Sequence, residues 1–292
     1  MSARGFRFGV CLIDESPSRQ DWIDKCRRAE DLGYDVILAP DHLNLAAPMT
    51  SVLLAAEATR RPRVGTYVVN SCFTTPVLLA REIATLDRFV EGRLDVGLGT
   101  GYVEWEFTRA GVPFGTPGSR VDALEHLTVA LDAALREENS GVLQRPRPPF
   151  LLGGHGNRVL KLAAAHADII SFVSASYRPE YQRMVVATRE QMRERTAFAR
   201  AAAGERAGKL EFNILSKVTL LSTSRESALS QVRRFGPHLS DDQIIDAPVI
   251  SVGSPASIAE QHERNREELG ITYITVMEAS MESFGTVIPL LS

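Results

Sequence analysis

The sequence predicts a closed (β/α)8 TIM barrel with insertions, built as a single domain over residues 1–292. Short apolar runs of strand length alternate with longer amphipathic runs of helical period along the whole chain. The strand-like runs number eight, as a closed parallel barrel requires. A length of 292 residues fits one barrel, because barrels commonly reach about 200–250 residues or more as one unit. An open doubly wound sheet is the alternative, since alternation alone does not show closure.

The expected strands carry apolar side chains at every second position or in short runs bounded by turn residues. Leu94, Val96 and Leu98 show the alternation, and Gly92 marks the turn that precedes them. We expect strands at residues 6–12, 34–39, 64–69, 94–98, 150–152, 169–173, 212–221 and 271–277.

The expected helices carry apolar residues three or four positions apart and begin or end at known helix signals. Gly33 ends the first helix, Pro76 lies in the first turn of the third, and Ser119 is expected to cap the fourth. We expect helices at residues 19–32, 52–59, 76–89, 119–135, 159–165, 179–203, 224–235 and 255–269, with a final helical segment toward Leu291. Residues 99–119 are expected to form a loop, and residues 236–253 an irregular excursion between helices.

Charge and cysteine content narrow the class of protein. Lys and Arg total 33 against 36 Asp and Glu, and no dense basic run suits a phosphate backbone, so a small-molecule substrate is expected rather than nucleic acid. Cys11, Cys26 and Cys72 are odd in number and scattered, which is typical of free thiols in a reducing compartment. With neither a signal peptide nor a run of about 18 apolar residues, a cytoplasmic protein without membrane attachment is expected.

The candidate site comprises the residues that follow the strands, because the carboxyl ends of barrel strands converge on one mouth. These segments are Asp41 and His42, residues 67–72, 99–106, 153–157 and 174–178. They contain no pattern with metal-ligand spacing, so no metal is indicated. The chain also lacks the G-x-S-x-G motif of serine hydrolases.

Within this set, two features have both a functional and a structural interpretation. His42 suits proton transfer near neutral pH, although a histidine beside an aspartate is about as often a structural pair. The Gly-rich turn at residues 153–157 opens a helix and suits a phosphate, although a turn without ligand is equally compatible. Trp105 and Phe107 can stack on a planar ring or merely cover the mouth, and Glu104 and Glu106 are expected to be solvated.

Four segments together resemble the bacterial luciferase-like flavin or deazaflavin oxidoreductases, most closely the subgroup that uses coenzyme F420. They are AEDLGYDVILAPDHL (29–43), LAREIATLDRFVEGRLDVGLGTGYVEWEFTRAGVPF (79–114), PPFLLGGHGNRVLKLAAAHADIISF (148–172) and VGSPASIAEQHERNREELGITYITV (252–276). The resemblance covers nearly the whole chain. Two departures are Thr75-Pro76, where the family often has His-Pro, and Val90-Glu91-Gly92-Arg93, where it usually has Ser-x-Gly-Arg. The first leaves any role for an imidazole at that position in doubt.

The resemblance implies a homodimer whose barrel mouth holds a flavin or deazaflavin ring. It places Asp41 and His42 in the ring pocket, a non-prolyl cis peptide at Tyr67-Val68 behind the ring, and the cofactor phosphate at the Gly-rich turn. The residues it implies along the ring are Gly99, Thr100, Gly101, Tyr102 and Trp105, and those at the phosphate turn are Gly153, Gly154, His155, Gly156 and Asn157. Arg158, Lys161 and Arg178 give only weak support for the extra cations that an acidic F420 tail would favour.

The resulting hypothesis is hydride transfer between F420 and an unidentified enone, carbonyl compound or alcohol, with His42 handling the proton and Asp41 fixing His42 or contacting the ring. Tyr102 and Trp105 would exclude water. The nearest alternative is a monooxygenase that uses reduced FMN from a separate reductase. Alternatives of other classes are a non-catalytic flavin-binding protein and a metal-free barrel lyase or hydrolase.

Overall fold

The strands close into a parallel barrel. A computed structural model describes residues 5–13, 18–178 and 183–292. Its main sheet has the order β3-β2-β1-β13-β10-β7-β6-β5-β4, all pairs are parallel, and a pairing between β3 and β5 closes the ring. The strands are β1 (Arg7–Cys11), β2 (Val36–Ala39), β3 (Arg63–Thr66), β4 (Val69–Asn70), β5 (Leu94–Gly99), β6 (Phe150–Gly154), β7 (Ile169–Phe172), β10 (Glu211–Ser216) and β13 (Ile271–Met277). Because β3 and β4 occupy one position in the ring, the barrel has eight strands as predicted, and the open sheet is excluded.

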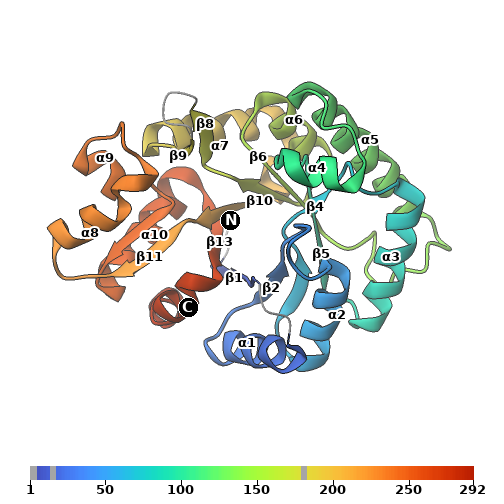
Figure 1. The fold of residues 1–292 in the computed structure, drawn as a ribbon, viewed down its shortest axis with the longest axis horizontal. Helices are drawn as coiled ribbons and strands as arrows, with labels where there is room; N and C mark the ends of the chain where they lie inside the picture. The colour runs from blue at the N-terminus through green and yellow to red at the C-terminus, as the bar shows by residue number, and fades with distance from the viewer. Residues whose placement is uncertain (1–4, 14–17, 179–182) are drawn as a thin grey trace.

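Helices surround the barrel (Figure 1). They are α1 (Arg19–Asp31), α2 (Pro48–Ala58), α3 (Pro76–Phe89), α4 (Glu104–Ala110), α5 (Pro117–Arg136), α6 (Asn157–His166), α7 (Arg189–Ala203), α8 (Arg225–Val232), α9 (Asp241–Ile245), α10 (Pro255–Leu269), α11 (Met281–Gly285) and α12 (Ile288–Leu291). Side-chain caps fix several starts, such as Ser18, whose hydroxyl accepts the N–H of Asp21 at 3.0 Å. No helix in the described ranges is long and apolar enough to cross a membrane.

Alternation along the strands divides the apolar residues into two cores. One set points outward and packs between sheet and helices, as Ile37, Leu98 and Phe150 do. The other fills the barrel interior and comprises Cys11, Val36, Leu38, Leu151, Ile169 and Tyr273, with Tyr67, Val68 and Met277 against them. The barrel is therefore a packed core below its mouth.

An ionic network closes the barrel at the amino ends of the strands. The carboxylate of Asp95, which is 2% exposed, pairs with Arg7 through one oxygen and with Arg63 through the other, the latter at 2.7 Å. Arg7 also pairs with Glu211 at 3.0 Å and lies over the ring of Tyr273, 4.5 Å from its centroid. Residues at this end of a barrel usually serve stability, because the chemistry lies at the other end.

The seventh strand was predicted to run through residues 212–221, and this is wrong. β10 ends at Ser216, and the next residues form β11 (Val218–Leu221), which pairs with β12 (Ile250–Gly253) outside the barrel. The N–H of Lys217 donates to the carbonyl of Val249 at 2.8 Å, which holds the chain where it leaves the barrel. The excursion expected at residues 236–253 thus contains α9 and a strand.

Several helices also differ from prediction, among them α2, which begins at Pro48 rather than at Val52. Residues 104–110 form α4 instead of loop, and α5 begins at Pro117 because Thr116 is its cap and Ser119 completes the capping box. The helix predicted at 179–203 begins only at Arg189, after an antiparallel hairpin of β8 (Ala175–Arg178) and β9 (Arg183–Val186). Residues 179–182 of that prediction lie outside the described ranges.

His262 makes a specific prediction about acid stability. It is fully buried on α10, its Nε2 lies 3.1 Å from the hydroxyl of Ser251, and burial together with the nearby Arg189 guanidinium lowers its pKa to about 4. The unfolded chain therefore takes up a proton at a higher pH than the folded chain does. Between about pH 7 and pH 5 we expect the wild type to lose about 2 kcal/mol more unfolding free energy than His262→Gln, as measured by urea unfolding. An equal loss in the wild type and in His262→Gln would contradict the lowered pKa of this histidine.

Candidate active site

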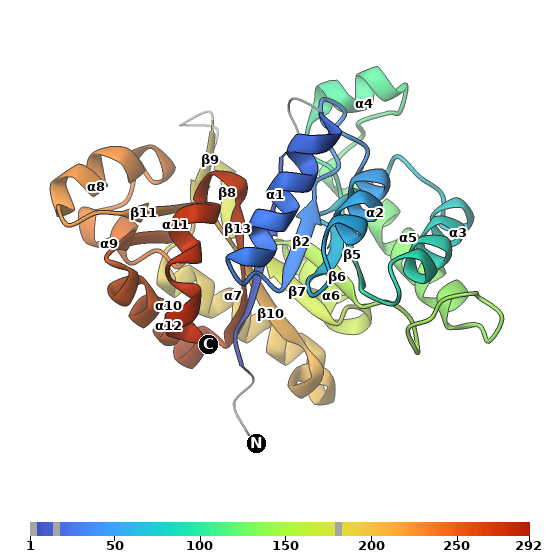
Figure 2. The ribbon, with the colours of Figure 1, turned by 90° about the horizontal axis from the view of Figure 1, so that it is seen from below.

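A histidine and a buried glutamate lie side by side at the mouth of the barrel. Nδ1 of His42, which follows β2, lies 2.8 Å from Oε1 of Glu106 on α4. The Glu106 side chain is 3% exposed, and the same oxygen accepts the backbone N–H of Leu43 at 3.3 Å. Figure 2 shows α4 at the same end of the barrel as the β8–β9 hairpin. The expectation that Glu106 is merely solvated is wrong.

Helix α4 holds Glu106 in position because Phe107, the next residue in the chain, anchors the helix in the core. Phe107 is fully buried, and its ring packs against those of Phe73 and Phe114 with centroid distances of 4.9 and 5.0 Å. Gly111 ends the helix in the left-handed conformation. The short helix is thus fixed at both its core face and its end, and it carries Glu106 inward toward His42.

The pair has the chemistry of a positioned proton donor or acceptor. A carboxylate bound to Nδ1 favours the tautomer with a proton there, which leaves Nε2 to exchange a proton with a ligand. The His42 side chain is 29% exposed, so the ring is reachable from the mouth. Tyr102 packs edge-on against the imidazole with centroids 5.9 Å apart.

Asp41 lies beside this pair but binds a different element. Its Oδ2 accepts the N–H of Asn70 at 2.9 Å, which joins the end of β2 to β4. Burial raises the pKa of Asp41. The amide oxygen of Asn70 in turn accepts the N–H of Cys72 at 3.0 Å. The partner that holds His42 is therefore Glu106, while Asp41 holds the neighbouring backbone in place.

The peptide between Tyr67 and Val68 is cis, at the position that the sequence resemblance indicated. The Tyr67 hydroxyl lies 2.5 Å from that of Ser171 and 3.1 Å from the amide oxygen of Asn213 across the barrel. The amide nitrogen of Asn213 donates to the hydroxyl of Thr275 at 2.8 Å. This hydrogen-bonded layer forms the floor of the mouth.

Gly99 is required by close packing against Val68. A Cβ at Gly99 would lie 2.4 Å from Cγ2 of Val68, and one at Gly101, where φ is +65°, would lie 2.4 Å from Nδ2 of Asn70. Beyond them, Tyr102 and Trp105 are 70% and 48% exposed. The strand end and the loop after it therefore offer bare backbone and aromatic surface to a ligand.

Replacing Gly99 by alanine is expected to lower the free energy of unfolding by about 2 kcal/mol, because the methyl group cannot fit unless Val68 moves. Urea unfolding measures this change. Gly118→Ala on α5 is the matched control, since the nearest atom to its Cβ would be 3.6 Å away and alanine favours a helix. A Gly99 variant as stable as the wild type would contradict the described packing.

The Gly-rich turn joins β6 to α6 and has the features of a phosphate site. Gly156 caps α6 without any side-chain hydrogen bond, and a Cβ there would meet nothing within 4 Å. The first N–H groups of α6 are therefore without a side-chain cap at the positive end of the helix dipole. Nδ1 of His155 is buried without a hydrogen-bond partner among the described residues. These donors and the orphaned nitrogen fit an oxyanion.

A cation that the sequence analysis did not identify contacts this turn. Nη1 of Arg195 on α7 donates to the side-chain oxygen of Asn157 at 2.7 Å, and Arg195 lines a cavity of about 190 Å³ with His155. Arg158 is instead paired with Asp122 on α5 at 2.6 Å. The side chain of Arg178 lies outside the described residues.

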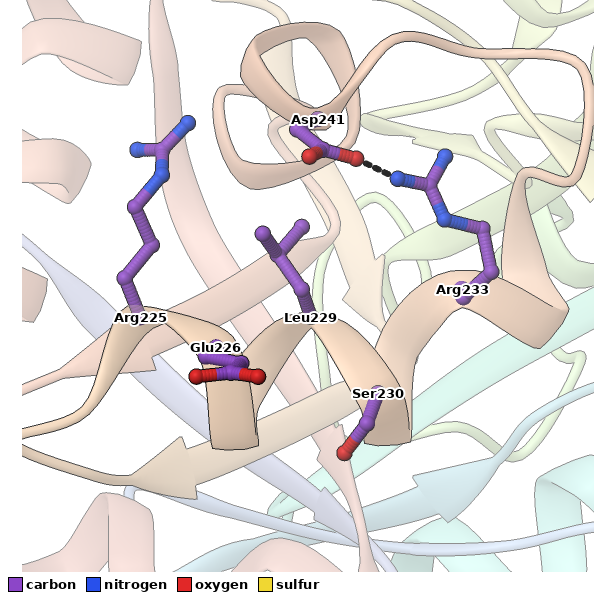
Figure 3. A pocket seen from close by; sticks show the side chains of 6 residues that line it. All are labelled: Arg225, Glu226, Leu229, Ser230, Arg233 and Asp241. Atoms are coloured by element: carbon purple, nitrogen blue, oxygen red, sulfur yellow. Dashed lines mark ion pairs between the residues drawn. The ribbon is translucent and has the colours of Figure 1, made fainter.

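Another cavity lies away from the mouth. A volume of about 590 Å³ is lined by residues of α8, the turn after it and α9, among them Leu229 and Ser230 (Figure 3). Its two arginines are already paired, Arg233 with Asp241 of the lining and Arg225 with Asp242 outside it. None of the predicted site residues lines this cavity.

Known proteins share this architecture. A family model described as luciferase-like monooxygenase matches residues 6–237. The chain is 29% identical over 164 residues to a 5,10-methylenetetrahydromethanopterin reductase from Archaeoglobus fulgidus, which covers 53% of this chain and 49% of that protein. The similarity thus spans about half the length of this curated relative.

Two solved structures superpose on nearly the whole chain. An F420-dependent secondary alcohol dehydrogenase in complex with an F420-acetone adduct does so with a TM-score of 0.73 and 18% identity, covering 99% of this chain and 100% of that one. Monooxygenase RslO1 from Streptomyces bottropensis superposes with a TM-score of 0.75 and 22% identity. The match covers 98% of this chain and 100% of that one. At these identities the matches show a shared fold, and the family match confirms the resemblance found in the sequence.

Proposed function

Because the chain belongs to the luciferase-like monooxygenase family, we propose that it is an oxidoreductase that transfers a hydride between coenzyme F420 and a small carbonyl compound, enone or alcohol. The observation that carries this proposal is the pair of His42 and Glu106 at the barrel mouth, 2.8 Å apart. The F420-dependent neighbour of the same fold, which holds an F420-acetone adduct, supports the cofactor and the substrate class.

The bound deazaflavin would supply a hydride donor or acceptor at its ring carbon C5. Nε2 of His42 would give or take the accompanying proton at the substrate oxygen or carbon, and Glu106 would hold the imidazole in the required tautomer. The cis peptide at Tyr67-Val68 and the backbone at Gly99 would support the ring. Tyr102 and Trp105 would cover it and keep water away.

The phosphate of the cofactor would lie at the amino end of α6. Gly156 leaves the approach open, the N–H groups that begin at Asn157 would donate to phosphate oxygens, and Arg195 lies within reach of the same turn. Nδ1 of His155, which has no hydrogen-bond partner in the part of the chain that the structure describes, supports an acceptor or donor from a bound ligand.

A monooxygenase reaction with reduced FMN is the second candidate. It is favoured by the family description and by the superposition with RslO1. In that case a separate reductase would supply the reduced flavin. The same turn at Gly156 would hold the FMN phosphate, so the site geometry is compatible with both cofactors.

The proposal includes a homodimer. Val77 and Leu78, in the first turn of α3, are 79% and 49% exposed, and a second copy of the chain would shield these apolar side chains. Light scattering during gel filtration measures the oligomeric state directly, and a monomer at all concentrations would contradict this part of the proposal.

The decisive experiment is a titration of the purified chain with F420 and with FMN, each oxidised and reduced, followed by fluorescence quenching and thermal shift. We expect F420 to bind with micromolar affinity or better and FMN to bind more weakly. Anaerobic turnover is then screened with enones, ketones and secondary alcohols. Preference for reduced FMN with oxygen uptake would establish the second candidate instead, and binding of neither cofactor would overturn both.

A further inference from the structure

Lys217 lies at the carboxyl end of a barrel strand that the proposed mechanism does not use. Side chains of β10 alternate, and those of Glu211 and Asn213 point into the barrel, because they bind Arg7 and Tyr67 there. Lys217 continues this inward set two residues beyond Leu215. Its backbone N–H is held by the carbonyl of Val249 at 2.8 Å, so the residue is fixed at the rim of the mouth.

The ammonium group of Lys217 has no counterion among the residues that the structure describes. The side chain is partly buried, and burial lowers the pKa of this lysine. Its electrostatic neighbour is the thiol of Cys11, which is 2% exposed at the end of β1. Cys11 also lies within the field of Glu278, but that carboxylate pairs with Lys25 at 2.7 Å and accepts the N–H of Ile13 at 2.6 Å. The carboxylate of Glu278 is therefore bound to Lys25 and Ile13 and not to Lys217.

Desolvation without a partner is costly for a cation, so an anion that binds at this position would recover part of that cost. The strand order places β10 four positions from β3 around the ring, which is the opposite side of the barrel. The hydrogen bond from Tyr67 to Asn213 spans this diameter two inward-facing positions below Lys217. Lys217 thus lies across the mouth from the Tyr67-Val68 peptide, which follows β3 and is called the Tyr67-Val68 wall below.

We propose that Lys217 binds an anionic group of the substrate, a carboxylate or a phosphate, across the mouth from the cofactor ring. This inference rests on the proposed function, because it takes the Tyr67-Val68 wall as the place of the ring. It narrows the substrate to a carbonyl compound, enone or alcohol with an acidic group at its far end. Lys217 would determine specificity and orientation and would take no part in proton transfer.

The test compares 4-oxo-2-pentenoate with its methyl ester, which differ in the charge of one group. Calorimetry with the chain loaded with oxidised F420 measures binding without turnover. We expect the wild type to bind the acid at least about 10-fold more tightly than the ester, and Lys217→Met to lose about 10- to 100-fold for the acid and less than about 2-fold for the ester. Inorganic phosphate, added as a competitor, shows whether a phosphate group is preferred over a carboxylate.

Two variants, a measurement of stability and a measurement of cofactor affinity serve as controls. Lys217→Arg should retain part of the preference for the acid, Lys209→Met removes an exposed lysine and should retain all of it, and thermal unfolding verifies that each variant is folded. A change in F420 affinity in Lys217→Met would overturn the proposal, since the lysine would then serve the cofactor. So would equal binding of acid and ester by the wild type, or a preference that survives Lys217→Met.

A partner within the chain is the competing explanation. Asp14 and Glu15 follow β1 in sequence and lie outside the described residues. The wild type could bind acid and ester equally while the double variant Asp14→Asn, Glu15→Gln prefers the acid. In that case the partner of Lys217 is a carboxylate of its own chain, and the proposal is overturned. The acid and ester are also compared on the unloaded chain, so failure of F420 and FMN to bind would overturn the proposed function while the Lys217 site is still decided.

Discussion

Replacing His42 by alanine is expected to lower kcat by about 100- to 10,000-fold while leaving the affinity for the cofactor nearly unchanged. The imidazole is the one proton donor or acceptor that the described part of the mouth holds on a buried carboxylate, with Nδ1 at 2.8 Å from Glu106. Loss of the imidazole removes the group that would transfer the proton. It leaves the surfaces that would bind the deazaflavin ring unchanged. Initial rates with the substrate found in the anaerobic screen, together with the fluorescence titration, measure both quantities.

The pairing with Glu106 predicts the effect of a second variant. Glu106→Gln keeps the shape of the side chain but removes the charge that favours the required tautomer, so kcat should fall in this variant too, by less than in His42→Ala. His166→Ala, at the end of α6, is the matched control and should behave like the wild type. Full turnover by folded, cofactor-loaded His42→Ala would exclude the proposed proton transfer.

Asp95→Asn is expected to lower the free energy of unfolding by about 3 kcal/mol. The variant leaves the guanidinium groups of Arg7 and Arg63 without their shared carboxylate at the closed end of the barrel. The expected loss lies at the lower end of the range for buried pairs, because the two arginine side chains are still 19% and 31% exposed. Equilibrium unfolding in urea measures the change.

The effect of Asp95→Asn should be confined to stability, because the network lies at the amino ends of the strands, away from His42. Cofactor affinity below the unfolding transition is expected to match the wild type. Glu282→Gln disrupts an exposed pair with Arg28 and should leave the urea midpoint almost unchanged. An Asp95 variant as stable as Glu282→Gln would show that the network does not stabilise the barrel.

The barrel could be predicted from sequence because its signals are local. Each strand is a short apolar run such as Val36–Ala39, and each helix has an apolar stripe and an end signal such as Gly33. The departure of the chain at Lys217 could not be predicted in this way. Residues 212–221 have strand-forming residues on both sides of Ser216 and Lys217, and only the pairing of β11 with β12 shows that the second half belongs to another sheet.

Part of the candidate site can be derived from the sequence alone. His42, the Gly99 loop and the Gly156 turn could be found from their position after strands. Glu106 was missed because the sequence does not show which of Glu104 and Glu106 is buried. A signal was present in the helix-forming residues that precede Gly111, a typical C-terminal residue of a helix. Arg195 was missed because it reaches Asn157 from 38 residues away in sequence.

The exit of the chain after β10 also bears on how this protein can diverge. Strands β11 and β12 pair with each other outside the barrel, while β10 and β13 complete the ring through their own register, for example Asn213 beside Tyr273. The intervening segment with α8 and α9 is therefore a module attached at the rim, visible at one side of the molecule in Figures 1 and 2. Its length and composition can change in evolution, or be exchanged by grafting, without breaking a barrel hydrogen bond. Because Lys217 lies where the module is attached, such changes would alter substrate preference first and leave His42 and Glu106 as they are.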